Sequence, residues 1–178
     1  MMEKGKGILK FILYLAVVAF SSYLIITYVA QRSQVIGDSM ITTLYDDDQL
    51  IMDKLTYRFQ DPKRFDIVVF RYLYRPKTYY VKRIIGLPGE TVQIVDGRIL
   101  INGEVLEENY GREVMLDGRK AKEPIILGDD EYFVLGDNRN YSADSRDSDV
   151  GSIKRSQILG KAKVVIWPLD HAGILRHQ

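Results

Sequence analysis

The sequence predicts a mainly β protein in which one N-terminal transmembrane helix precedes an antiparallel β-sheet domain. Residues 11–30 form a run of twenty residues without a charged side chain, and a helix of about 20 residues spans a hydrocarbon core roughly 30 Å thick. Beyond this run the chain consists of short apolar runs, rich in β-branched and aromatic residues, separated by turn residues. That pattern is typical of antiparallel sheets.

Charges on either side of the apolar run predict its orientation. Lys4, Lys6 and Lys10 precede it, whereas Arg32 is the only basic residue between residues 11 and 52. Because basic residues stay preferentially on the cytoplasmic side, the N-terminus is expected there. The predicted organisation is a cytoplasmic segment at 1–10, a transmembrane helix at 11–30 and an extracytoplasmic domain at 31–178, held at the cell membrane.

Two other interpretations of the apolar run stay open. A cleavable signal peptide would have an apolar region of about 7 to 15 residues and a small-residue cleavage site. This run is longer and carries the bulky Tyr28 and Val29 near its end. A buried core helix is the second alternative, although an uncharged run of this length at the N-terminus favours a membrane span.

Six apolar runs in the domain are predicted strands. They occupy residues 66–70, 79–85, 91–95, 98–101, 132–135 and 160–167. Asp96-Gly97 and Asn102-Gly103 favour two-residue hairpin turns, and Pro88-Gly89 suits a type II turn, which together indicate a β-meander. Residues 104–128 are more polar and less regular, which predicts a small inserted cap on the β core.

Charge and cysteine content argue against several classes of function. Residues 1–32 carry a net charge of +3 and the remainder −2, so the domain has no electrostatic basis for binding nucleic acid. The chain has no cysteine. A thiol nucleophile, a thiolate zinc site and a disulfide framework are therefore excluded together.

Ser39 follows the apolar run closely, in the stretch VIGDSMITTL at 35–44. A serine hydroxyl is a weak nucleophile that needs a neighbouring base. The two histidines, His171 and His177, lie in the C-terminal tail, where loose order is expected, and are poor candidates. Lysine is the remaining base. Taken alone, Ser39 is equally compatible with an ordinary turn.

Lys82 is the candidate base. A lysine with the usual pKa near 10.4 is neutral in only ~0.04 % of molecules at pH 7, so a lysine base must be buried among apolar groups. Strand alternation places Lys82 on one face with Tyr80 and Ile84 and Arg83 on the other. Taken alone, a solvent-facing lysine is the usual interpretation of such a position.

A third polar stretch, GDNRNYSADSR at 136–146, follows the predicted strand at 132–135. Asp144 and Arg146 are close enough in sequence to pair, and Ser142 can donate or accept a hydrogen bond. A well-capped turn explains this stretch on its own.

Together the stretches resemble the bacterial type I signal peptidases, in their short Gram-positive form. The resemblance covers nearly the whole chain and includes the N-terminal apolar run. Its motifs are GDSMITTL at 37–44, RFDIVVF at 64–70, YYVKRIIGLPGE at 79–90 and LGDNRNYSADSR at 135–146. Their order agrees with the family, as does the spacing of 43 residues from Ser39 to Lys82.

This resemblance implies roles for particular residues. Ser39 would be the nucleophile and Lys82 its general base, while Ser142 would orient the lysine, and Asp144 with Arg146 would hold the active-site loop together. The family's shallow pocket for small substrate side chains maps onto Ile36, Leu44, Tyr80 and Val81.

The resemblance also implies a function. The expected enzyme is a membrane-bound serine endopeptidase that removes signal peptides from secretory preproteins, cleaving after small residues in A-x-A-like sites. Its partners would be those preproteins and the lipid bilayer. The chain is expected to be a monomer that needs no metal and no organic cofactor.

Three positions depart from the family pattern. Thr42 stands where proline is usual, which removes a rigid φ from the turn that presents Ser39. Phe65 stands where glycine is usual, and Gly37 stands where some relatives have a serine whose hydroxyl contributes to the oxyanion hole.

Other functions are alternatives. The chain could be a catalytically impaired membrane-anchored paralogue that binds exported proteins. A self-cleaving Ser/Lys repressor would need a DNA-binding domain where this chain has its apolar run. A calcium-binding domain could use residues 46–48 or 144–149, but neither run has the ligand spacing of an EF-hand.

Overall fold

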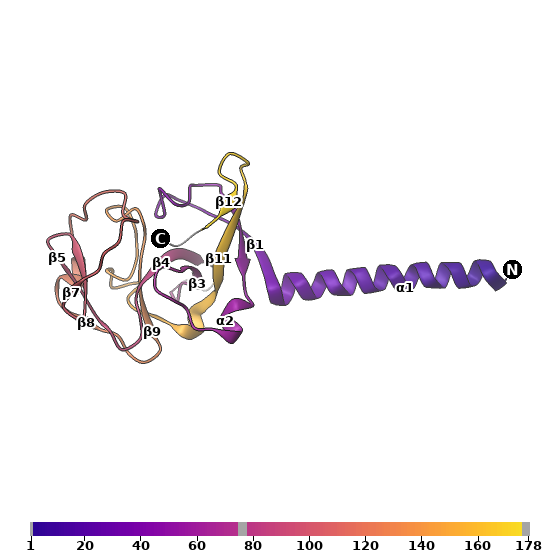
Figure 1. The fold of residues 1–178 in the computed structure, drawn as a ribbon, viewed down its shortest axis with the longest axis horizontal. Helices are drawn as coiled ribbons and strands as arrows, with labels where there is room; N and C mark the ends of the chain where they lie inside the picture. Colours follow the sequence, from indigo (N-terminus) through magenta and orange to yellow (C-terminus); the bar gives the residue numbers. More distant parts are fainter. Residues whose placement is uncertain (1, 75–77, 176–178) are drawn as a thin grey trace.

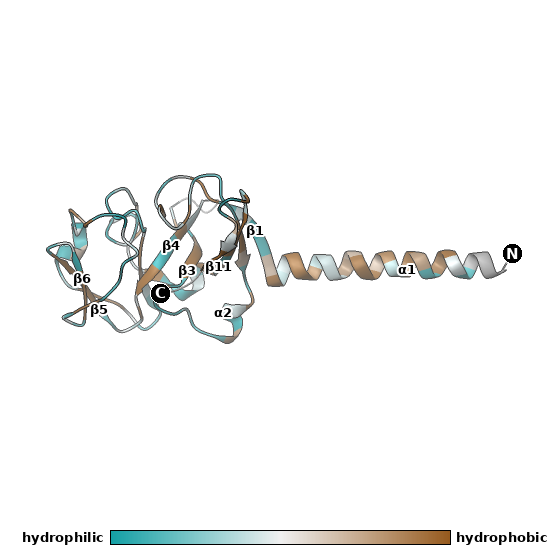
Figure 2. Ribbon diagram, turned by 45° about the horizontal axis from the view of Figure 1, so that its top comes forward, coloured by the Kyte–Doolittle hydropathy of each residue, from teal (hydrophilic) through white to brown (hydrophobic). Residues whose placement is uncertain are grey.

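A single long helix leads into a β domain, as the computed structural model shows for residues 2–74 and 78–175 (Figure 1). Helix α1 spans Met2–Leu24, and a π-helical turn η1 continues it over Ile25–Val29. The stretch Lys6–Val29 is long and apolar enough to cross a membrane, and none of it is buried (Figure 2). The alternative of a buried core helix is therefore wrong.

The larger of two sheets forms the body of the domain. All of its paired strands are antiparallel. Its order is β1 (Ala30–Gln34), β2 (Gln49–Asp53), β11 (Ile158–Trp167), β3 (Ile67–Arg71), β4 (Tyr79–Gly86), β9 (Glu131–Leu135) and β10 (Ile153–Lys154), with β12 (Gly173–Ile174) paired to β11. The prediction of a mainly β, antiparallel domain is confirmed.

Both faces of this sheet are covered, which explains the unbroken apolar run in β3. Ile67 and Val69 point into one buried cluster with Leu44 and Met52 of neighbouring segments. Val68 and Phe70 point the opposite way, into a second cluster that contains the aromatic rings of Tyr57 and Tyr132. A strand buried on both faces reads as a continuous hydrophobic run and not as an alternation.

A smaller sheet contains the two predicted hairpin turns. Its order is β7 (Glu104–Val105), β6 (Arg98–Ile101), β5 (Thr91–Val95) and β8 (Ile125–Ile126). Asp96-Gly97 and Asn102-Gly103 have positive φ angles at all four residues, as type I′ turns require. The segment 104–128 supplies β7, β8 and the 3-10 helix η2 (Arg119–Lys122), while β5 and β6 complete the layer.

A third buried cluster joins the two sheets. Phe133 and Leu135 of β9 contribute to it from the large sheet, and Val92, Ile94 and Ile99 contribute from the small one. The small sheet therefore packs on the end of the large sheet that lies away from α1 (Figure 1). Two short helices, α2 (Thr56–Phe59) and η3 (Arg155–Gln157), complete the secondary structure of the described residues.

Candidate active site

The loop between β1 and β2 carries Ser39. Its two ends are joined by backbone hydrogen bonds, from Val35 N–H to Asp48 O at 2.8 Å and from Asp47 N–H to Val35 O at 3.1 Å. Met40 and Leu44 are almost completely buried in the core below the loop. The loop is thereby fixed at its base and along its apolar side, and Ser39 between these anchors stays partly exposed.

Lys82, on β4, lies beside this serine. Its Nζ atom is 2.8 Å from Ser39 Oγ and donates to Val81 O at 3.0 Å. The Nζ atom also lies 5.1 Å from the ring centroid of Tyr80. The lysine side chain is only 4 % exposed. Two residues 43 positions apart in sequence are thus brought into hydrogen-bond contact by β4 and the loop after β1.

Burial changes the proton affinity of this lysine. Loss of water around the amine lowers the pKa of Lys82 to about 8, while the negative charges of Asp144 and Asp137 act in the opposite direction. Burial disfavours the charged form of an amine, so desolvation is the dominant cause. A hydroxyl beside an amine with such a pKa can lose its proton to that amine near neutral pH.

Two residues that follow β9, Asp137 and Asn138, hold the serine loop from the other side. Asn138 donates from Nδ2 to Asp38 O at 3.0 Å and from its backbone N–H to Ser39 O at 3.1 Å. Thr43 Oγ1 donates to Asp137 Oδ2 at 2.5 Å. The Ser39 backbone is therefore bonded directly to the segment 137–138.

Arg83 anchors Asp137 in turn. Its Nε and Nη2 atoms donate to the two carboxylate oxygens at 2.8 and 2.6 Å, and its guanidinium lies 3.6 Å from the ring centroid of Tyr110. Sequence reasoning missed Arg83, Asp137 and Asn138. The signal was present, because Arg83 follows Lys82 directly and Asp137-Asn138 lies inside the motif at 135–146.

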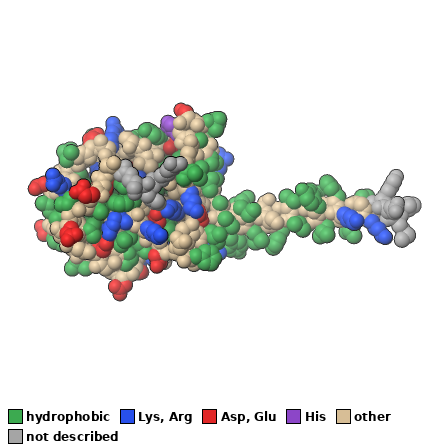
Figure 3. Space-filling model, viewed as in Figure 1, with side chains coloured by type: hydrophobic (Ala, Val, Ile, Leu, Met, Phe, Trp, Pro, Cys, Tyr) green, Lys and Arg blue, Asp and Glu red, His purple; other side chains and the backbone are tan. Residues whose placement is uncertain are grey.

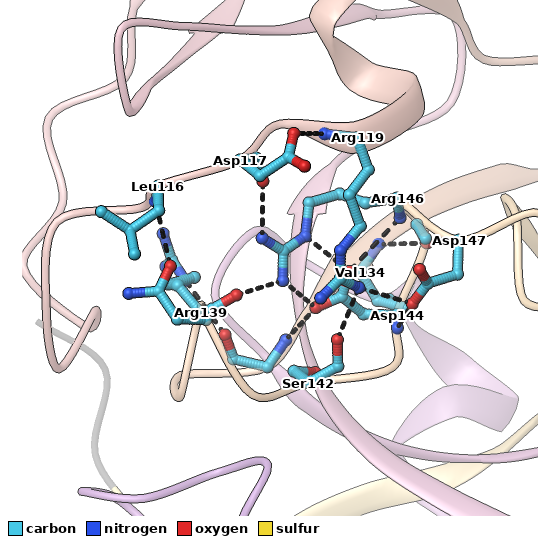
Figure 4. A network of polar contacts seen from close by, with 12 residues as sticks. Leu116, Asp117, Arg119, Val134, Arg139, Ser142, Asp144, Arg146 and Asp147 are labelled. Atoms are coloured by element: carbon cyan, nitrogen blue, oxygen red, sulfur yellow. Dashed lines mark hydrogen bonds and ion pairs between the residues drawn. The ribbon is translucent and has the colours of Figure 1, made fainter.

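Asp144 and Arg146 form a second buried ion pair. Arg146 donates from Nε and Nη2 to the two Asp144 oxygens, both at 2.8 Å, and from Nη2 to Arg139 O at 2.5 Å. Asp144 Oδ2 accepts from the Gly136 N–H at 3.1 Å. Figure 4 shows this network next to Ser142. The pair closes the loop 136–146 on itself.

Ser142 is buried next to the serine loop. Its side chain is 3 % exposed, and its Oγ atom has no hydrogen-bond partner among the described residues. Gly136 separates it from the nucleophile loop, because a Cβ at position 136 would collide with both Ser142 Oγ and Ser39 O. The structure thus places Ser142 close to the Ser39 backbone and leaves its hydroxyl unsatisfied.

A cavity of about 1070 Å³ opens beside the two residues. Ser39 and Lys82 line it together with Ile36, Tyr80 and Val81 of the expected substrate pocket. Leu44 does not line this cavity. It lies instead in the core, packed in one cluster with Val35 and Met40, because the turn at 40–44 directs its side chain inward.

The aspartates proposed as calcium ligands have other partners. Asp46 Oδ1 accepts from the Gly37 N–H at 2.7 Å, and Asp47 Oδ1 accepts from Gln34 Nε2 at 2.8 Å. The third, Asp48, lies 3.2 Å from His171 Nδ1, so this histidine supports the loop base and does not face Ser39. His177 lies outside the described residues.

Comparison with known proteins identifies the family. The family model described as signal peptidase, peptidase S26, matches residues 6–167. A signal peptidase I of Leptolyngbya laminosa is 42 % identical over 156 residues, 84 % of this chain and 74 % of that protein. A signal peptidase I P of Bacillus subtilis subsp. natto is 34 % identical over 182 residues, 98 % and 96 % of the two chains.

A solved structure is also similar. A crystal structure of a signal peptidase I from Enterococcus faecalis V583 is 33 % identical, with a TM-score of 0.48, and covers 57 % of this chain and 97 % of that one. The family model and the relatives above establish what the motifs suggest. This chain belongs to the signal peptidases of the peptidase S26 family.

Proposed function

We propose that this chain is a membrane-anchored serine endopeptidase that removes signal peptides from secreted precursor proteins, with Ser39 as nucleophile and Lys82 as general base. The observation that carries the proposal is the 2.8 Å contact between Ser39 Oγ and the buried Lys82 Nζ. The relatives named signal peptidase I support the substrate class.

The protonation state of the lysine supports the role of base. With a pKa of about 8, roughly 9 % of Lys82 is neutral at pH 7, against about 0.03 % for a lysine at its ordinary value near 10.5. The reactive form is therefore some 300-fold more abundant than in an exposed lysine. The Val81 carbonyl, which accepts from Nζ, directs the amine toward Ser39.

The reaction proceeds by acyl transfer. Lys82 takes the proton of Ser39, whose oxygen attacks the carbonyl carbon at the cleavage site and forms a tetrahedral oxyanion. The Ser39 backbone N–H is an oxyanion donor, a class of contact worth about 2.7 to 4 kcal/mol. Collapse releases the amine of the mature protein as Lys82 donates a proton, and water then hydrolyses the Ser39 ester with Lys82 again as base.

Ser142 orients the lysine in this scheme. A neutral amine has two N–H groups and one lone pair. With the lone pair facing the Ser39 hydroxyl and one N–H given to Val81 O, one N–H is left. The buried Ser142 Oγ, which has no partner in the described part of the chain, supplies an acceptor in the adjoining loop. Asp144 and Arg146 keep that loop in place through their ion pair.

The substrate binds as an extended segment in the cavity. Consecutive residues of β1 (31–34) with 35–36, and of β4 and its approach (78–82), line the cavity on two sides. Strand edges bind extended peptides through backbone hydrogen bonds. Ile36, Tyr80 and Val81 supply the apolar surface that selects small side chains before the cleaved bond.

The anchor explains why the nucleophile lies close to the helix. Residues 1–10 stay in the cytoplasm, the apolar helix crosses the cell membrane and residues 31–178 lie outside. Nine positions separate Ala30 from Ser39, so the serine is confined within about 30 Å of the membrane surface. Precursors held in the same membrane by their own apolar segments are thereby concentrated near it.

The test is cleavage of a precursor by the full-length chain in lipid vesicles. We expect wild type to release the mature protein and Ser39→Ala and Lys82→Met to release none. Ser156→Ala and Lys63→Met, at exposed positions outside the cavity, serve as matched controls and should cleave like wild type. Cleavage of the precursor by either Ser39→Ala or Lys82→Met would contradict the mechanism. Binding of precursor without cleavage by wild type would favour the impaired paralogue.

A further inference from the structure

The charged side chains around the cavity are all basic. Besides Lys82, the charged residues that line it are Arg32, Lys54, Arg58, Arg71 and Arg155. Among the described residues, no Asp or Glu lines the cavity. The whole chain has 25 basic and 24 acidic residues, so this cluster is a local asymmetry and not the consequence of a general excess of positive charge.

Four of these five cations have no ion pair among the described residues. In the described parts of the chain, Arg155 alone among the five forms an ion pair, a 3.9 Å contact with Asp61, whose side chain is 93 % exposed. Arg58 lies over the Tyr28 ring at 5.3 Å, and Lys54 Nζ donates to Thr27 O at 3.3 Å. Neither contact compensates a positive charge with a negative one.

Three arginines elsewhere in the domain contrast with this pattern. Arg64 is 2.5 Å from the Glu90 carboxylate, Arg119 is 2.6 Å from Asp147 and Arg139 is 2.7 Å from Glu108. Figure 3 shows Lys and Arg side chains gathered on the middle of the domain's face, between α1 and the far end. A concave site lined by one sign of charge concentrates ligands of the opposite sign.

We propose that the cavity binds an acidic side chain of the precursor, close to the bond that is cleaved. This inference rests on the proposed function, because Ser39 and Lys82 line the same cavity as the five cations. Arg32 and Arg71 are the central residues of this basic subsite. Within the described ranges neither has an ion pair, and neither makes the contacts with the end of the apolar helix that Lys54 and Arg58 make. An Asp or Glu of the substrate supplies the missing partner.

Strand geometry gives the position of that acidic residue. Arg71 is paired in register with Tyr79, three positions before Lys82 along β4. At about 3.3 Å per residue, this places the Arg71 backbone roughly 10 Å along the strand from the base. An extended substrate advances by the same rise, so its carboxylate is expected about three to four residues from the cleaved bond.

Anionic lipid headgroups are the competing ligand for part of this cluster. Lys54 and Arg58 contact Thr27 and Tyr28 at the end of the apolar helix, where a membrane surface would lie. Arg71, in contrast, ends β3 beside β4 and the candidate base. The observations therefore favour the peptide as ligand at Arg71, and a lipid effect becomes an outcome of the test.

The experiment uses full-length protein in a neutral detergent and a set of precursor peptides. Each peptide carries Glu, Gln or Lys at one of the four positions on either side of the cleaved bond. At one of these positions we expect Glu to lower KM about two- to fivefold relative to Gln, and Lys to raise it, with the difference reduced at high salt. Arg71→Gln or Arg32→Gln should abolish this discrimination. Arg98→Gln, in the small sheet, is the matched control and should retain it.

Charge reversal makes the test specific. Arg71→Glu should prefer the Lys peptide at the position where wild type prefers Glu, which a loss of folding would not produce. Equal KM for Glu and Gln peptides at every position overturns the proposal. The proposal is also overturned if both Arg71→Gln and Arg32→Gln keep the wild-type preference for the Glu peptide. It is overturned as well if these variants change KM only in the presence of anionic lipid vesicles and independently of peptide charge.

Binding of the same peptides to Ser39→Ala, measured by fluorescence anisotropy, separates this proposal from the proposed function. A charge preference in binding with no cleavage by wild type would leave the subsite standing and remove the peptidase. Cleavage by wild type without any charge preference in binding would support the peptidase and remove the basic subsite.

Discussion

Arg83 donates to both carboxylate oxygens of Asp137, and each side chain is 1 % exposed or less. This pair connects β4, which carries the candidate base, to the segment that hydrogen-bonds the backbone of Ser39. Its geometry is bidentate, the strongest form of arginine–carboxylate contact. Positioning of the serine beside Lys82 therefore depends on a residue adjacent to the lysine itself.

Removal of one partner of this pair should be costly. We expect Asp137→Ala to lower the free energy of unfolding by about 3 to 5 kcal/mol, because it leaves a buried guanidinium unpaired. Urea unfolding of the full chain in detergent micelles, followed by the fluorescence of the single tryptophan, Trp167, measures this. Glu113→Ala removes an exposed pair at 3.6 Å and should cost less than about 1 kcal/mol. Equal effects of the two substitutions would contradict the role of burial.

Lys82→Met should stabilise the fold while it abolishes activity. The pKa of Lys82 is lowered in the folded state from 10.5 to about 8. Burial of the charged amine therefore costs stability below pH 8, by about 3 kcal/mol, and this cost disappears as the pH rises from 8 toward 10.5. The gain from Met should be large at pH 6 and small at pH 10, as urea unfolding at both pH values will show. A gain that is independent of pH would mean that Lys82 is not desolvated.

Ser142→Ala should separate activity from stability. The hydroxyl has no partner among the described residues, so its loss removes no hydrogen bond from the resting structure. In the proposed mechanism it orients Lys82, so kcat should fall about 10- to 100-fold, the equivalent of one hydrogen bond to the ammonium that Lys82 becomes when it takes the Ser39 proton. We expect the unfolding midpoint to stay near that of wild type. A lower midpoint with unchanged kcat would assign Ser142 a purely structural role.

Phe65 adopts a backbone conformation that favours glycine, with φ of 70°. Its ring lies 5.0 Å from that of Tyr110, which gives the side chain a packing role at this strained position. Both Phe65→Ala and Phe65→Gly remove the ring, but of these two residues only glycine adopts positive φ without a steric penalty. Phe65→Gly should therefore be more stable than Phe65→Ala by about 1 kcal/mol. Equal midpoints in urea would show that the φ angle carries no strain.

Much of the fold could be predicted because several strands coincide with apolar runs in the sequence. The hairpin turns at Asp96-Gly97 and Asn102-Gly103 were equally clear, since their positive φ angles suit these residues. Strand β1 (Ala30–Gln34) was not predicted. Its sequence AQRSQ is mostly polar and has no alternation, because it forms an edge of the sheet with a largely exposed burial pattern.

The site was predicted less completely than the fold. Strand alternation separates Lys82 from Arg83, but it does not show that both faces of β4 are covered, so it could not predict that Arg83 is 1 % exposed and Lys82 4 % exposed. Leu44 was expected in the substrate pocket, although the loop turns it into the core. Tertiary packing determines the burial of these side chains, and no local sequence pattern predicts it.

The pH dependence of peptide cleavage is the most direct test that Lys82 is the general base. The chain has no cysteine, so in a Lys82→Cys variant alkylation modifies position 82 alone. Treatment of the unfolded variant with bromoethylamine, followed by refolding, converts that cysteine into a lysine analogue whose amine has a lower pKa. For wild type we predict that kcat/KM rises with pH through about 8, as the amine loses its proton. Unmodified Lys82→Cys should be inactive, and the alkylated protein should be active with its rise moved to lower pH. A rise that stays at the wild-type pH, or activity in the unmodified variant, would contradict the assignment of Lys82 as the base.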